Sequence, residues 1–473
     1  MRQIKADICV IGAGSGGLSV AAAASQMGAS TVLIERGRMG GDCLNYGCVP
    51  SKSLLAAAHA AMSARKAPVF GVDCGEPRVE SARVYAHVRS VIAAIAPTDS
   101  VDRFEGLGVT VLKAEARFVS PREVEAGDTR ITARRFVVAT GSSPIVPPIP
   151  GLDGVPFDTN ETIFERSALP RRLIIIGGGP IGMEMAQAHR GLGADVTCLD
   201  RFTILPKDDP ELVAILGKLL RDEGINIIEN AEIASAEKTA DGVALNYKLN
   251  GQTARVEGTD LLVAAGRKAN VEKLNLEAAG VEYTPRGVKV DARLRSSNKH
   301  IYAVGDAAGQ YQFTHIAGYH AGIVIRNALL RIPAKVDYRA VPWVTFTAPE
   351  LAHVGMSEDE AKAKHGEIRV LRWPFHDNDR AQAERVTDGL VKVIATKRGQ
   401  VLGASILGAH AGELIQTWGL AIAGGLKLGT VAGMIAPYPT LGEVNKRAAG
   451  SFYTSFIFGP KIKRLVRFLS HFG

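Results

Sequence analysis

The chain has 473 residues, 46% hydrophobic and 22% charged, a composition typical of a globular protein that is too long for one hydrophobic core. No run of about 18 uncharged apolar residues occurs, so we expect no membrane span. Five cysteines, an odd number, do not suggest a disulfide framework and favour a cytoplasmic protein. The net charge of +8 lies partly in a basic tail, so we expect no nucleic-acid partner.

The first 35 residues form a strand, glycine turn, helix and second strand. The chain enters the strand Ala6–Ile11 almost at once, so we expect no secretory signal. The run Gly12-Ala13-Gly14-Ser15-Gly16-Gly17 leads into an alanine-rich helix, and the second strand ends at an acid. Glycines let the backbone approach a pyrophosphate, and the acid can accept from a ribose hydroxyl. We predict a dinucleotide site at Gly12, Gly14, Gly17 and Glu35.

Two cysteines, Cys43 and Cys48, follow in the stretch Gly41–Lys52. A spacing of five places side chains on different faces of a regular helix, so a disulfide between them needs an irregular turn, which Gly47 and Pro50 permit. A thiol at a helix N-terminus has a lowered pKa, which favours the reactive thiolate. The stretch therefore predicts a redox-active cysteine pair.

The strand, glycine and acid pattern occurs a second time. The strand Arg172–Ile176 leads into Gly177-Gly178-Gly179-Pro180-Ile181-Gly182, a helix follows, and the next strand ends at an acid. First glycine and acid are 23 residues apart in both copies, 12 to 35 and 177 to 200. We predict a second dinucleotide site at Gly177, Gly179, Gly182 and Asp200. Two such sites beside a dithiol indicate electrons passing between cofactors and on to sulfur.

Four further segments complete the pattern of a known family. They are Ala139-Thr140-Gly141-Ser142, Gly266-Arg267-Lys268-Ala269-Asn270, Ile301-Tyr302-Ala303-Val304-Gly305-Asp306 and Pro349-Glu350-Leu351-Ala352-His353-Val354-Gly355. To about residue 455 the chain resembles the flavin-dependent pyridine nucleotide–disulfide oxidoreductases, the family of dihydrolipoamide dehydrogenase, glutathione reductase and mercuric reductase. The resemblance implies an α/β fold with two Rossmann-like domains, for FAD and NAD(P), and an α+β C-terminal dimerisation domain in a homodimer.

The resemblance and the turn residues together divide the chain. We expect the FAD-binding domain in two parts, residues 1–150 and 266–340, around an NAD(P)-binding domain at 151–265. A dimerisation domain follows at 341–455, and a basic amphipathic tail at 456–473. The proline-rich run Pro144–Pro150 marks the first boundary.

The resemblance also implies roles for individual side chains. Cys48 is implied as the thiolate nearest the flavin and Cys43 as the interchange thiol that meets the substrate. Lys52, one turn beyond Cys48, is implied to stabilise reduced flavin and to pair with Glu184. The other residues implied at the cofactors are Thr140, Gly141, Asp306 and Ala317 for FAD, and Gly266 for the nicotinamide nucleotide.

The choice of nicotinamide nucleotide depends on Asp200. An acid at this position accepts from a 2′-hydroxyl and repels a 2′-phosphate, whereas the neighbouring Arg201 can accommodate a phosphate. We predict NAD(H) over NADP(H).

The largest departure from the family lies near the C-terminus. Disulfide reductases carry a His-Pro there, followed by a glutamate, and the histidine is acid and base for the interchange thiol. This chain has Tyr438 in the histidine position and Glu443 in the glutamate position. A phenol with a pKa near about 10 is a poor proton acceptor at neutral pH, so we expect disulfide or dithiol turnover to suffer. Mercuric reductase has a tyrosine there too, but it ends in a cysteine pair that this chain lacks.

The segment Pro460–Leu469 lies beyond the family's usual end. Its apolar residues at 462, 465, 466 and 469 follow helical spacing with basic residues between them, which predicts a short basic amphipathic helix. Two interpretations are open: weak attachment to an anionic membrane or an acidic partner, or docking on the dimer. The shortness of the segment favours docking on the dimer.

Three functions are open from the sequence. The favoured one is an FAD-dependent NAD(P)H oxidoreductase that acts on a disulfide or dithiol through Cys43 and Cys48, as dihydrolipoamide dehydrogenase does. The second is reduction of a soft metal ion, as in mercuric reductase, because thiolate pairs suit soft metals. The third is an electron-transfer component docked on a membrane or protein partner. We expect no resident metal and a cytoplasmic location, peripheral to the inner face of a membrane if the tail attaches there.

Overall fold

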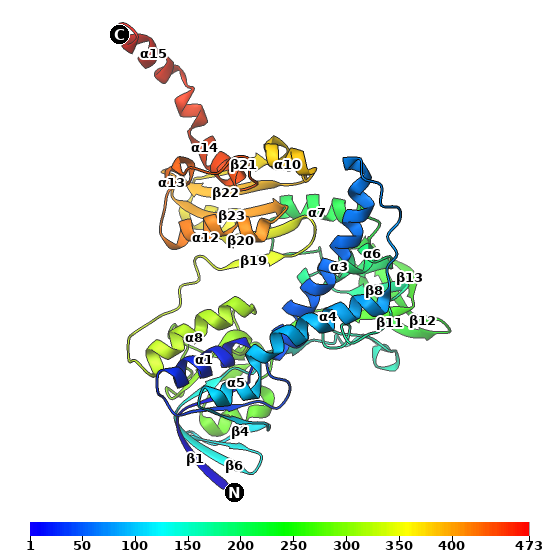
Figure 1. The fold of residues 1–473 in the computed structure, drawn as a ribbon, viewed down its shortest axis with the longest axis vertical. Coiled ribbons are helices and arrows are strands. Elements are labelled where there is room, and N and C mark those ends of the chain that lie inside the picture. The colour runs from blue at the N-terminus through cyan, green and yellow to red at the C-terminus, as the bar shows by residue number, and fades with distance from the viewer. Residues whose placement is uncertain (473) are drawn as a thin grey trace. The chain divides into compact units, whose positions relative to one another are not determined.

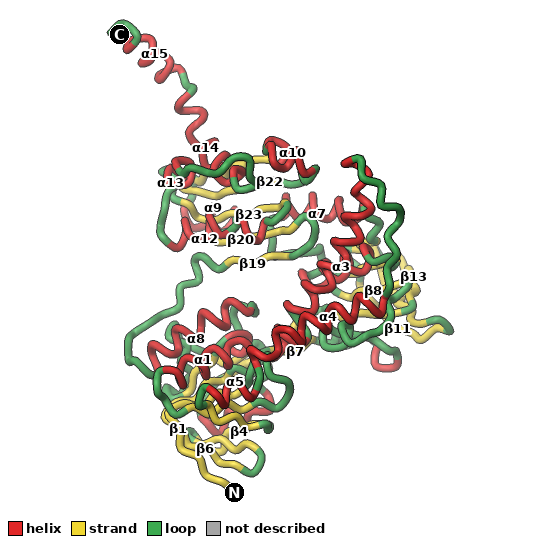
Figure 2. Tube along the Cα trace, in the orientation of Figure 1, coloured by secondary structure: helices red, strands yellow, loops and turns green. Residues whose placement is uncertain are grey.

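The structure is a computed structural model that describes residues 1–472 (Figure 1). The chain forms two compact units. The first comprises Met1–Arg201 and Ile228–Val336, and the second comprises Phe202–Ile227 and Asp337–Gly473. Figure 2 shows that helices and strands occur throughout both units, as an α/β chain requires.

A seven-stranded sheet forms the centre of the first unit. Its parallel part joins β1 (Arg2–Ile11), β2 (Thr31–Ile34), β3 (Val109–Leu112), β6 (Thr129–Val138) and β18 (Ile301–Ala303). Two antiparallel strands extend it, β4 (Ala116–Ser120) and β5 (Glu123–Ala126), in the order β3-β2-β1-β6-β5-β4 with β18 also on β6. Ile8, Val10 and Ile11 are buried, as in a parallel strand whose two faces are both covered.

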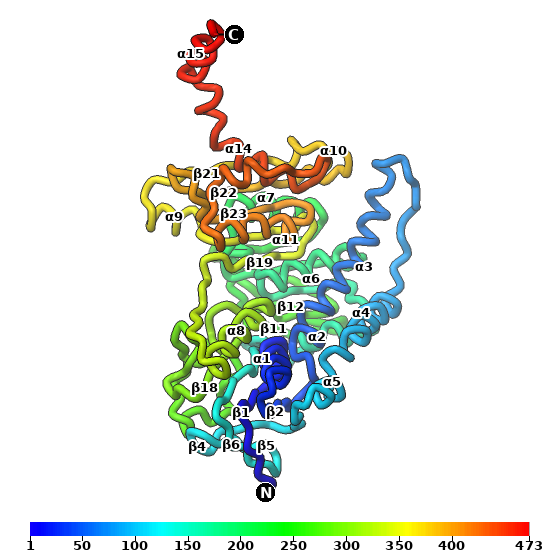
Figure 3. Tube along the Cα trace, turned by 60° about the vertical axis from the view of Figure 1, so that its left-hand side comes forward, coloured from blue at the N-terminus to red at the C-terminus, as the bar shows by residue number. Residues whose placement is uncertain are grey.

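Two helices cover one face of this sheet. They are α1 (Ser15–Gln26) and α8 (Thr314–Ala328), which lie side by side in Figures 1 and 3. Their buried residues, among them Val20, Ala24 and Val324, share one apolar cluster with the strands. On the other face Phe118 packs edge-to-face on Phe136, with ring centroids 5.5 Å apart.

A smaller parallel sheet in the first unit contains β8 (Arg172–Ile176), β9 (Asp195–Leu199) and β14 (Asp260–Val263), in the order β9-β8-β14. Helix α6 (Pro180–Gly191) connects β8 to the parallel strand β9, so the strand, helix, strand unit occurs twice in this unit. A three-stranded antiparallel sheet of β11 (Glu232–Thr239), β12 (Gly242–Leu249) and β13 (Gln252–Gly258) follows.

Four helices follow the first nucleotide motif along the chain. They are α2 (Gly41–Asn45), α3 (Cys48–Lys66), α4 (Ser81–Ile95) and α5 (Val101–Gly106). Helix α3 packs closely on α6, because a Cβ on Gly191 would lie 2.9 Å from Met62 Sδ and 3.2 Å from the Cβ of Ala58. This packing brings the helix that begins with Cys48 against the helix of the second motif.

The second unit is built on a five-stranded antiparallel sheet in the order β19-β20-β23-β22-β21. The strands are β19 (Pro342–Thr345), β20 (Glu350–Gly355), β21 (Ile368–Pro374), β22 (Leu390–Thr396) and β23 (Val401–Gly408). The helices of this unit include α7 (Pro210–Asp222), α9 (Glu358–His365), α10 (Asp379–Glu384), α11 (Ala411–Leu414), α12 (Gln416–Ala423), α13 (Leu428–Gly433), α14 (Glu443–Ile457) and α15 (Pro460–Leu469). Trp418 is fully buried in the core and donates to Asn445 Oδ1 at 2.8 Å.

A buried lysine ties α7 and α9 to this sheet. The Lys392 side chain is 4% exposed, and its Nζ lies 2.7 Å from Asp209, 3.1 Å from Glu211 and 3.0 Å from Glu358. Arg372 adds a two-pronged contact to Glu211. A buried cation with this many carboxylate partners is compensated, whereas the carboxylates alone would repel one another.

The expected elements and fold class are confirmed. The strands ending at Ile34, Ile176 and Leu199 are present, and α15 spans the predicted residues. Helix α6 begins at Pro180, inside the second glycine motif, because proline is well tolerated in the first turn. Within residues 1–472 no helix is long and apolar enough to cross a bilayer. The division of the chain into five domain segments stays a prediction.

Candidate cofactor and redox site

The two cysteines lie at the junction of two helices in the first unit. Cys43 belongs to α2, and Cys48 is the first residue of α3. The chain leaves helical geometry between them, with Gly47 at φ −124° and ψ −112°. This irregular turn lets the two thiols form a hydrogen bond with each other, although five residues separate them. Both cysteines are free thiols in the structure.

The two thiols have opposite acidities. A hydrogen bond from Cys43, the Thr314 hydroxyl and the charge of Lys52 together lower the pKa of Cys48 to about 6. The same hydrogen bond, together with burial, raises the pKa of Cys43 above its usual range. Thr314 Oγ1 lies 3.4 Å from Cys48 Sγ. At neutral pH the negative charge therefore resides on Cys48 and the proton on Cys43.

The ion pair implied by the resemblance is present. Lys52 Nζ lies 2.7 Å from Glu184 Oε2 and joins α3 to α6. The Glu184 side chain is 6% exposed, so its charge depends on Lys52 for compensation. The pair fixes a cation one turn beyond Cys48, which is the end of α3 where the sulfurs lie.

The first glycine motif forms a tight turn with its acid. Ala13 N and Gly37 N each donate to the Glu35 carboxylate at 2.6 Å. Gly12 has φ +104°, and a Cβ there would overlap the Ala139 carbonyl oxygen. Gly17 contacts the Gly12 carbonyl too closely for any side chain, and Gly14 caps α1 with its backbone in an extended conformation. The motif thus leaves a side-chain-free backbone surface at a helix N-terminus, which fits a pyrophosphate.

A pocket opens beside this motif. Its lining includes Gly12, Glu35, Thr140, Lys268 and Asn270. Two hydrogen bonds join two of these lining residues: Thr140 Oγ1 donates to Asn270 O at 2.6 Å, and Asn270 Nδ2 donates to Thr140 O at 3.1 Å. An acid, a backbone turn and polar walls in one pocket fit the nucleotide half of FAD.

The remaining residues implied for FAD lie in the same unit. Gly141 follows Thr140 with φ +67°. Ser142 donates to Asp306 Oδ2 at 2.5 Å, and burial raises the pKa of Asp306. Ala317 on α8 is buried and lies close to Gly305. A Cβ on Gly305 would be 3.0 Å from the Cβ of Ala317.

The second glycine motif repeats the first in detail. Gly178 N donates to Asp200 Oδ2 at 2.6 Å, just as Ala13 N donates to Glu35. Gly177 has φ +115°, and a Cβ there would overlap the Ala264 carbonyl oxygen, two residues before Gly266. Gly179 caps α6, and Gly182 contacts the Gly177 carbonyl oxygen too closely for any side chain. These residues fit a second dinucleotide.

Tyr438 and Glu443 lie in the second unit. The Tyr438 ring is 68% exposed, and its hydroxyl donates to Asp379 Oδ2 at 2.8 Å. This hydrogen bond raises the pKa of Tyr438. Glu443 is the first residue of α14, where a carboxylate is favoured by the helix dipole.

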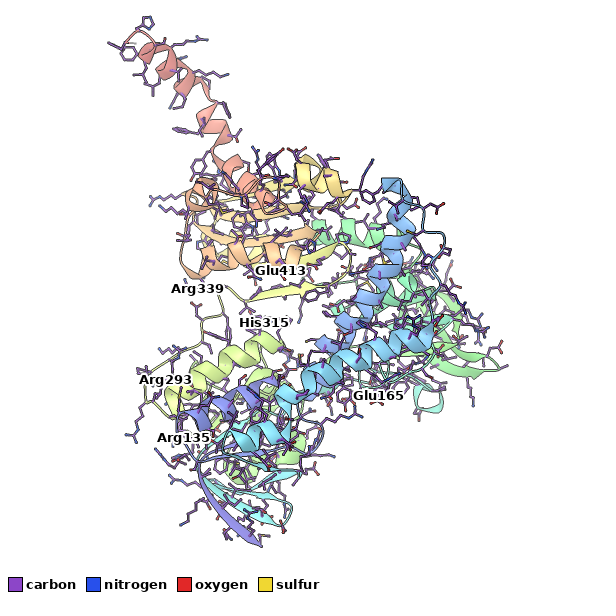
Figure 4. The ribbon with its side chains drawn as sticks, in the orientation of Figure 1. Arg135, Glu165, Arg293, His315, Arg339 and Glu413 are labelled. Atoms are coloured by element: carbon purple, nitrogen blue, oxygen red, sulfur yellow. The ribbon has the colours of Figure 1, made fainter. Side chains whose placement is uncertain are left out.

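Several site residues had no assigned role from the sequence. Thr314 is the first residue of α8. The next residue, His315, is labelled in Figure 4, and its ring stacks on Phe313 with ring centroids 5.2 Å apart. The contact of Thr314 with Cys48 has no sequence signal, because 266 residues separate them. Arg267 Nη2 lies 2.9 Å from Asp42, directly before Cys43. Asp379 carries no motif at all.

With this geometry established, comparison with known proteins identifies the family. Residues 6–321 match the pyridine nucleotide-disulphide oxidoreductase family, and residues 341–449 match its dimerisation domain. The chain therefore belongs to the pyridine nucleotide-disulphide oxidoreductases, and it is a flavoprotein oxidoreductase. The dimerisation domain supports a homodimer.

Relatives with different names are about equally similar. Mercuric reductase of Bacillus cereus is 37% identical over 449 residues, which cover 94% of this chain and 71% of the relative. Dihydrolipoyl dehydrogenase of Geobacillus stearothermophilus is 35% identical over 454 residues, covering 94% of this chain and 96% of the relative. Identity alone therefore does not select a substrate.

Solved structures share the fold. The HOCl-induced flavoprotein disulfide reductase RclA of Escherichia coli, solved as a Cu(II) complex, has a TM-score of 0.84 at 27% identity, covering 93% of this chain and 99% of RclA. LpdA of Mycobacterium tuberculosis has a TM-score of 0.85 at 26% identity and covers 95% of this chain and 99% of LpdA. Within residues 1–472 no group of three or more His, Cys, Asp or Glu side chains is placed to hold a metal.

Proposed function

We propose that this protein is an FAD-dependent NADH oxidoreductase that reduces or oxidises a disulfide–dithiol substrate through Cys43 and Cys48. The observation that carries the proposal is the placement of Cys43 in α2 and Cys48 at the start of α3, with Thr314 Oγ1 3.4 Å from the Cys48 sulfur and the Lys52–Glu184 ion pair one turn further along α3. When bound, NADH supplies a hydride and FAD passes the electron pair to the cysteine disulfide.

The residues that would hold FAD are those of the first motif. The backbone from Gly12 to Gly17 offers the surface for the pyrophosphate, and Glu35 offers an acceptor to the ribose. Thr140, Gly141, Asp306 and Ala317 line the path from there to α8 in the proposed site. Lys52, held in place by Glu184 at 2.7 Å, supplies positive charge near the sulfurs.

The cysteine chemistry balances with one proton. Two electrons and one proton convert the Cys43–Cys48 disulfide into the Cys43 thiol and the Cys48 thiolate. Cys43 then loses its proton and attacks a substrate disulfide, forming a mixed disulfide and releasing one substrate thiol that takes the proton. Cys48 attacks the Cys43 sulfur, restores the disulfide and releases the second substrate sulfur as thiolate. The raised pKa of Cys43 makes the loss of its proton the demanding step.

Asp200 supports NADH as the coenzyme. Its carboxylate is held by Gly178 N at 2.6 Å, at the end of β9, where the adenosine ribose lies in this class of fold. A 2′-phosphate at that point meets a fixed negative charge. The odd number of cysteines, which does not suggest a disulfide framework, supports a cytoplasmic location.

Reduction of a soft metal ion is the second candidate. It is favoured by Tyr438, because a metal held between two thiolates needs no proton on a leaving thiol. A relative at 37% identity is a mercuric reductase, and the RclA structure contains Cu(II). In this candidate the two cysteine sulfurs bind the ion as substrate, and no resident metal is involved.

One experiment separates the two candidates. The purified holoenzyme is reduced anaerobically with NADH and then mixed with lipoamide, glutathione disulfide, mercuric ion or cupric ion, while flavin absorbance reports reoxidation. Rapid reoxidation by a disulfide supports the proposal. Reoxidation by the metal ions alone, abolished by Cys43→Ser, would replace it with the metal-reductase function.

A further inference from the structure

The last helix, α15, has no place in the reaction, yet it exposes a large apolar surface. In Figures 1 and 3 the chain from α14 to α15 runs away from the five-stranded sheet of its own unit. The large apolar side chains of this segment are exposed: Leu465 48%, Val466 59%, Phe468 60%, Leu469 53% and Phe472 74%. The match to the family's dimerisation domain ends at residue 449, so this surface lies outside the shared fold. An exposed apolar patch of this kind marks an interaction site.

Three of the four basic residues of α15 lie on the side opposite its apolar residues. Successive residues of a helix are rotated by about 100°. One side therefore presents the apolar residues Ile462, Leu465, Val466, Phe468, Leu469 and Phe472. Phe468 and Phe472 contact edge-to-face, with centroids 5.2 Å apart, and form one aromatic edge of that side. The other side presents Lys463, Arg464 and Arg467, whereas Lys461, in the first turn, lies near the edge of the apolar side.

The charge of this segment has one sign. Residues 444–473 contain six lysines and arginines and no aspartate or glutamate. They therefore hold six of the chain's eight net positive charges. A helix with an apolar side and with basic but no acidic residues is complementary to a surface that has an apolar interior and an anionic boundary.

We propose that α15 docks the enzyme on the surface of an anionic lipid bilayer. The apolar side enters the boundary between headgroups and acyl chains, and the basic side remains among the anionic headgroups. Packing of α15 on the same helix of a second copy fits less well, because the basic residues of the two helices repel one another with no acid in the segment to offset them.

A homodimer carries two such helices. One short amphipathic helix binds lipid weakly. In a dimer, binding of the first helix holds the second close to the membrane, so the dimer binds more tightly than either helix alone. The proposal is independent of the redox function, since it uses no residue of the nucleotide or cysteine sites.

Vesicle flotation with the full-length holoenzyme tests this proposal. Vesicles of phosphatidylcholine with phosphatidylglycerol are compared with vesicles of phosphatidylcholine alone. We expect binding to the anionic vesicles, and its loss as salt rises from about 0.1 M to about 1 M, which shortens the Debye length from about 10 Å to about 3 Å.

Two matched pairs of variants locate the contact. Arg467→Glu changes the charge of α15 by two and lowers the partition coefficient roughly tenfold to thirtyfold, whereas Arg398→Glu, an exposed arginine outside the tail, leaves it unchanged. Phe468→Ser lowers it roughly tenfold or more, whereas Phe70→Ser, at an aromatic ring exposed to 54%, does not. Flavin absorbance and NADH-dependent activity, unchanged in all four, show that each variant is folded.

Three results overturn the proposal. The first is absence of binding by the unaltered enzyme. The second is binding that Arg467→Glu and Phe468→Ser do not reduce. The third is a chain truncated before Pro460 that dissociates into monomers in light scattering, because the helix then docks on the second copy.

Discussion

Tyr438 donates its phenolic hydrogen to Asp379 at 2.8 Å, and the carboxylate raises the pKa of the phenol. A tyrosine in this arrangement keeps its proton throughout the neutral range, so it can donate a hydrogen bond but cannot remove a proton from a thiol. The family's histidine acts as acid and base at this position. The hydrogen bond to Asp379 therefore increases the chemical difference between the two side chains.

Tyr438→His is expected to raise turnover of lipoamide or glutathione disulfide. General acid–base catalysis is typically worth about 10² to 10⁴ in rate, so even partial recovery is measurable as kcat. Tyr438→Phe, which keeps the ring and removes the hydroxyl, is the control and should gain nothing. Metal-ion reduction should not rise in either variant. High native disulfide turnover that falls in Tyr438→His would show that the tyrosine is itself a competent catalyst.

Cys48→Ser is expected to abolish the long-wavelength absorbance band that a thiolate beside a bound flavin produces on two-electron reduction. Cys43→Ser should retain the band, because Cys48 carries the negative charge. Anaerobic titration with NADH measures both. If the band survives in Cys48→Ser, the negative charge does not reside on Cys48.

The same band should depend on pH with a midpoint near the pKa of Cys48, about 6. The sign follows from the lowered pKa: the thiolate is present above the midpoint and is lost as pH falls through it. Lys52→Met removes a positive charge that lowers this pKa, so its midpoint should move upward. Lys66→Met, near the end of the same helix, is the control and should leave the midpoint in place. An unshifted midpoint in Lys52→Met would show that Lys52 does not act on the sulfur.

Asp200→Ser is expected to reduce the preference for NADH. The repulsion of a 2′-phosphate is worth about 1 to 3 kcal/mol, so kcat/KM for NADPH should rise roughly fivefold to 150-fold. Stopped-flow reduction with each coenzyme measures this. Asp195→Ser, at the other end of β9, should leave the preference unchanged. A native enzyme that NADPH reduces faster would mean that Arg201 controls the choice.

Lys392→Met is expected to destabilise the second unit by about 3 to 5 kcal/mol, because Asp209, Glu211 and Glu358 lose the buried cation they share. Lys397→Met is the matched control. Its partner is Glu367, both side chains are exposed, and the loss of such a pair costs about 0 to 1 kcal/mol. The free energy of unfolding in denaturant, followed by tryptophan fluorescence, compares the two. Equal losses would contradict a special role for the buried cluster.

The parts predicted from the sequence are those encoded by neighbouring residues. Strand and helix positions around both glycine motifs follow from local periodicity, and the break between Cys43 and Cys48 follows from their spacing and Gly47. The sequence predicts no role for Thr314 or Asp379. Thr314 is 266 residues from Cys48 along the chain, and Asp379 is 59 residues from Tyr438. Contacts between residues this far apart depend on tertiary packing, which no local pattern reports. The sequence predicts a helix at Pro460–Leu469, and α15 has these bounds. Only the structure shows how much of its apolar side is exposed.

The matching turns at Ala13 with Glu35 and at Gly178 with Asp200 have a consequence for how long each nucleotide stays bound. In the proposed reaction one nucleotide remains through many catalytic cycles, and the other must leave in every cycle. Because both turns use a backbone N–H donor and a carboxylate acceptor 2.6 Å apart, we do not expect them to produce that difference in residence time. We expect the difference to come from outside them, and the hydrogen bonds of Thr140 with Asn270 join two residues that line the first site. We therefore expect these hydrogen bonds to slow the release of flavin, and Asn270→Ala to shorten the residence time of FAD without changing that of NADH.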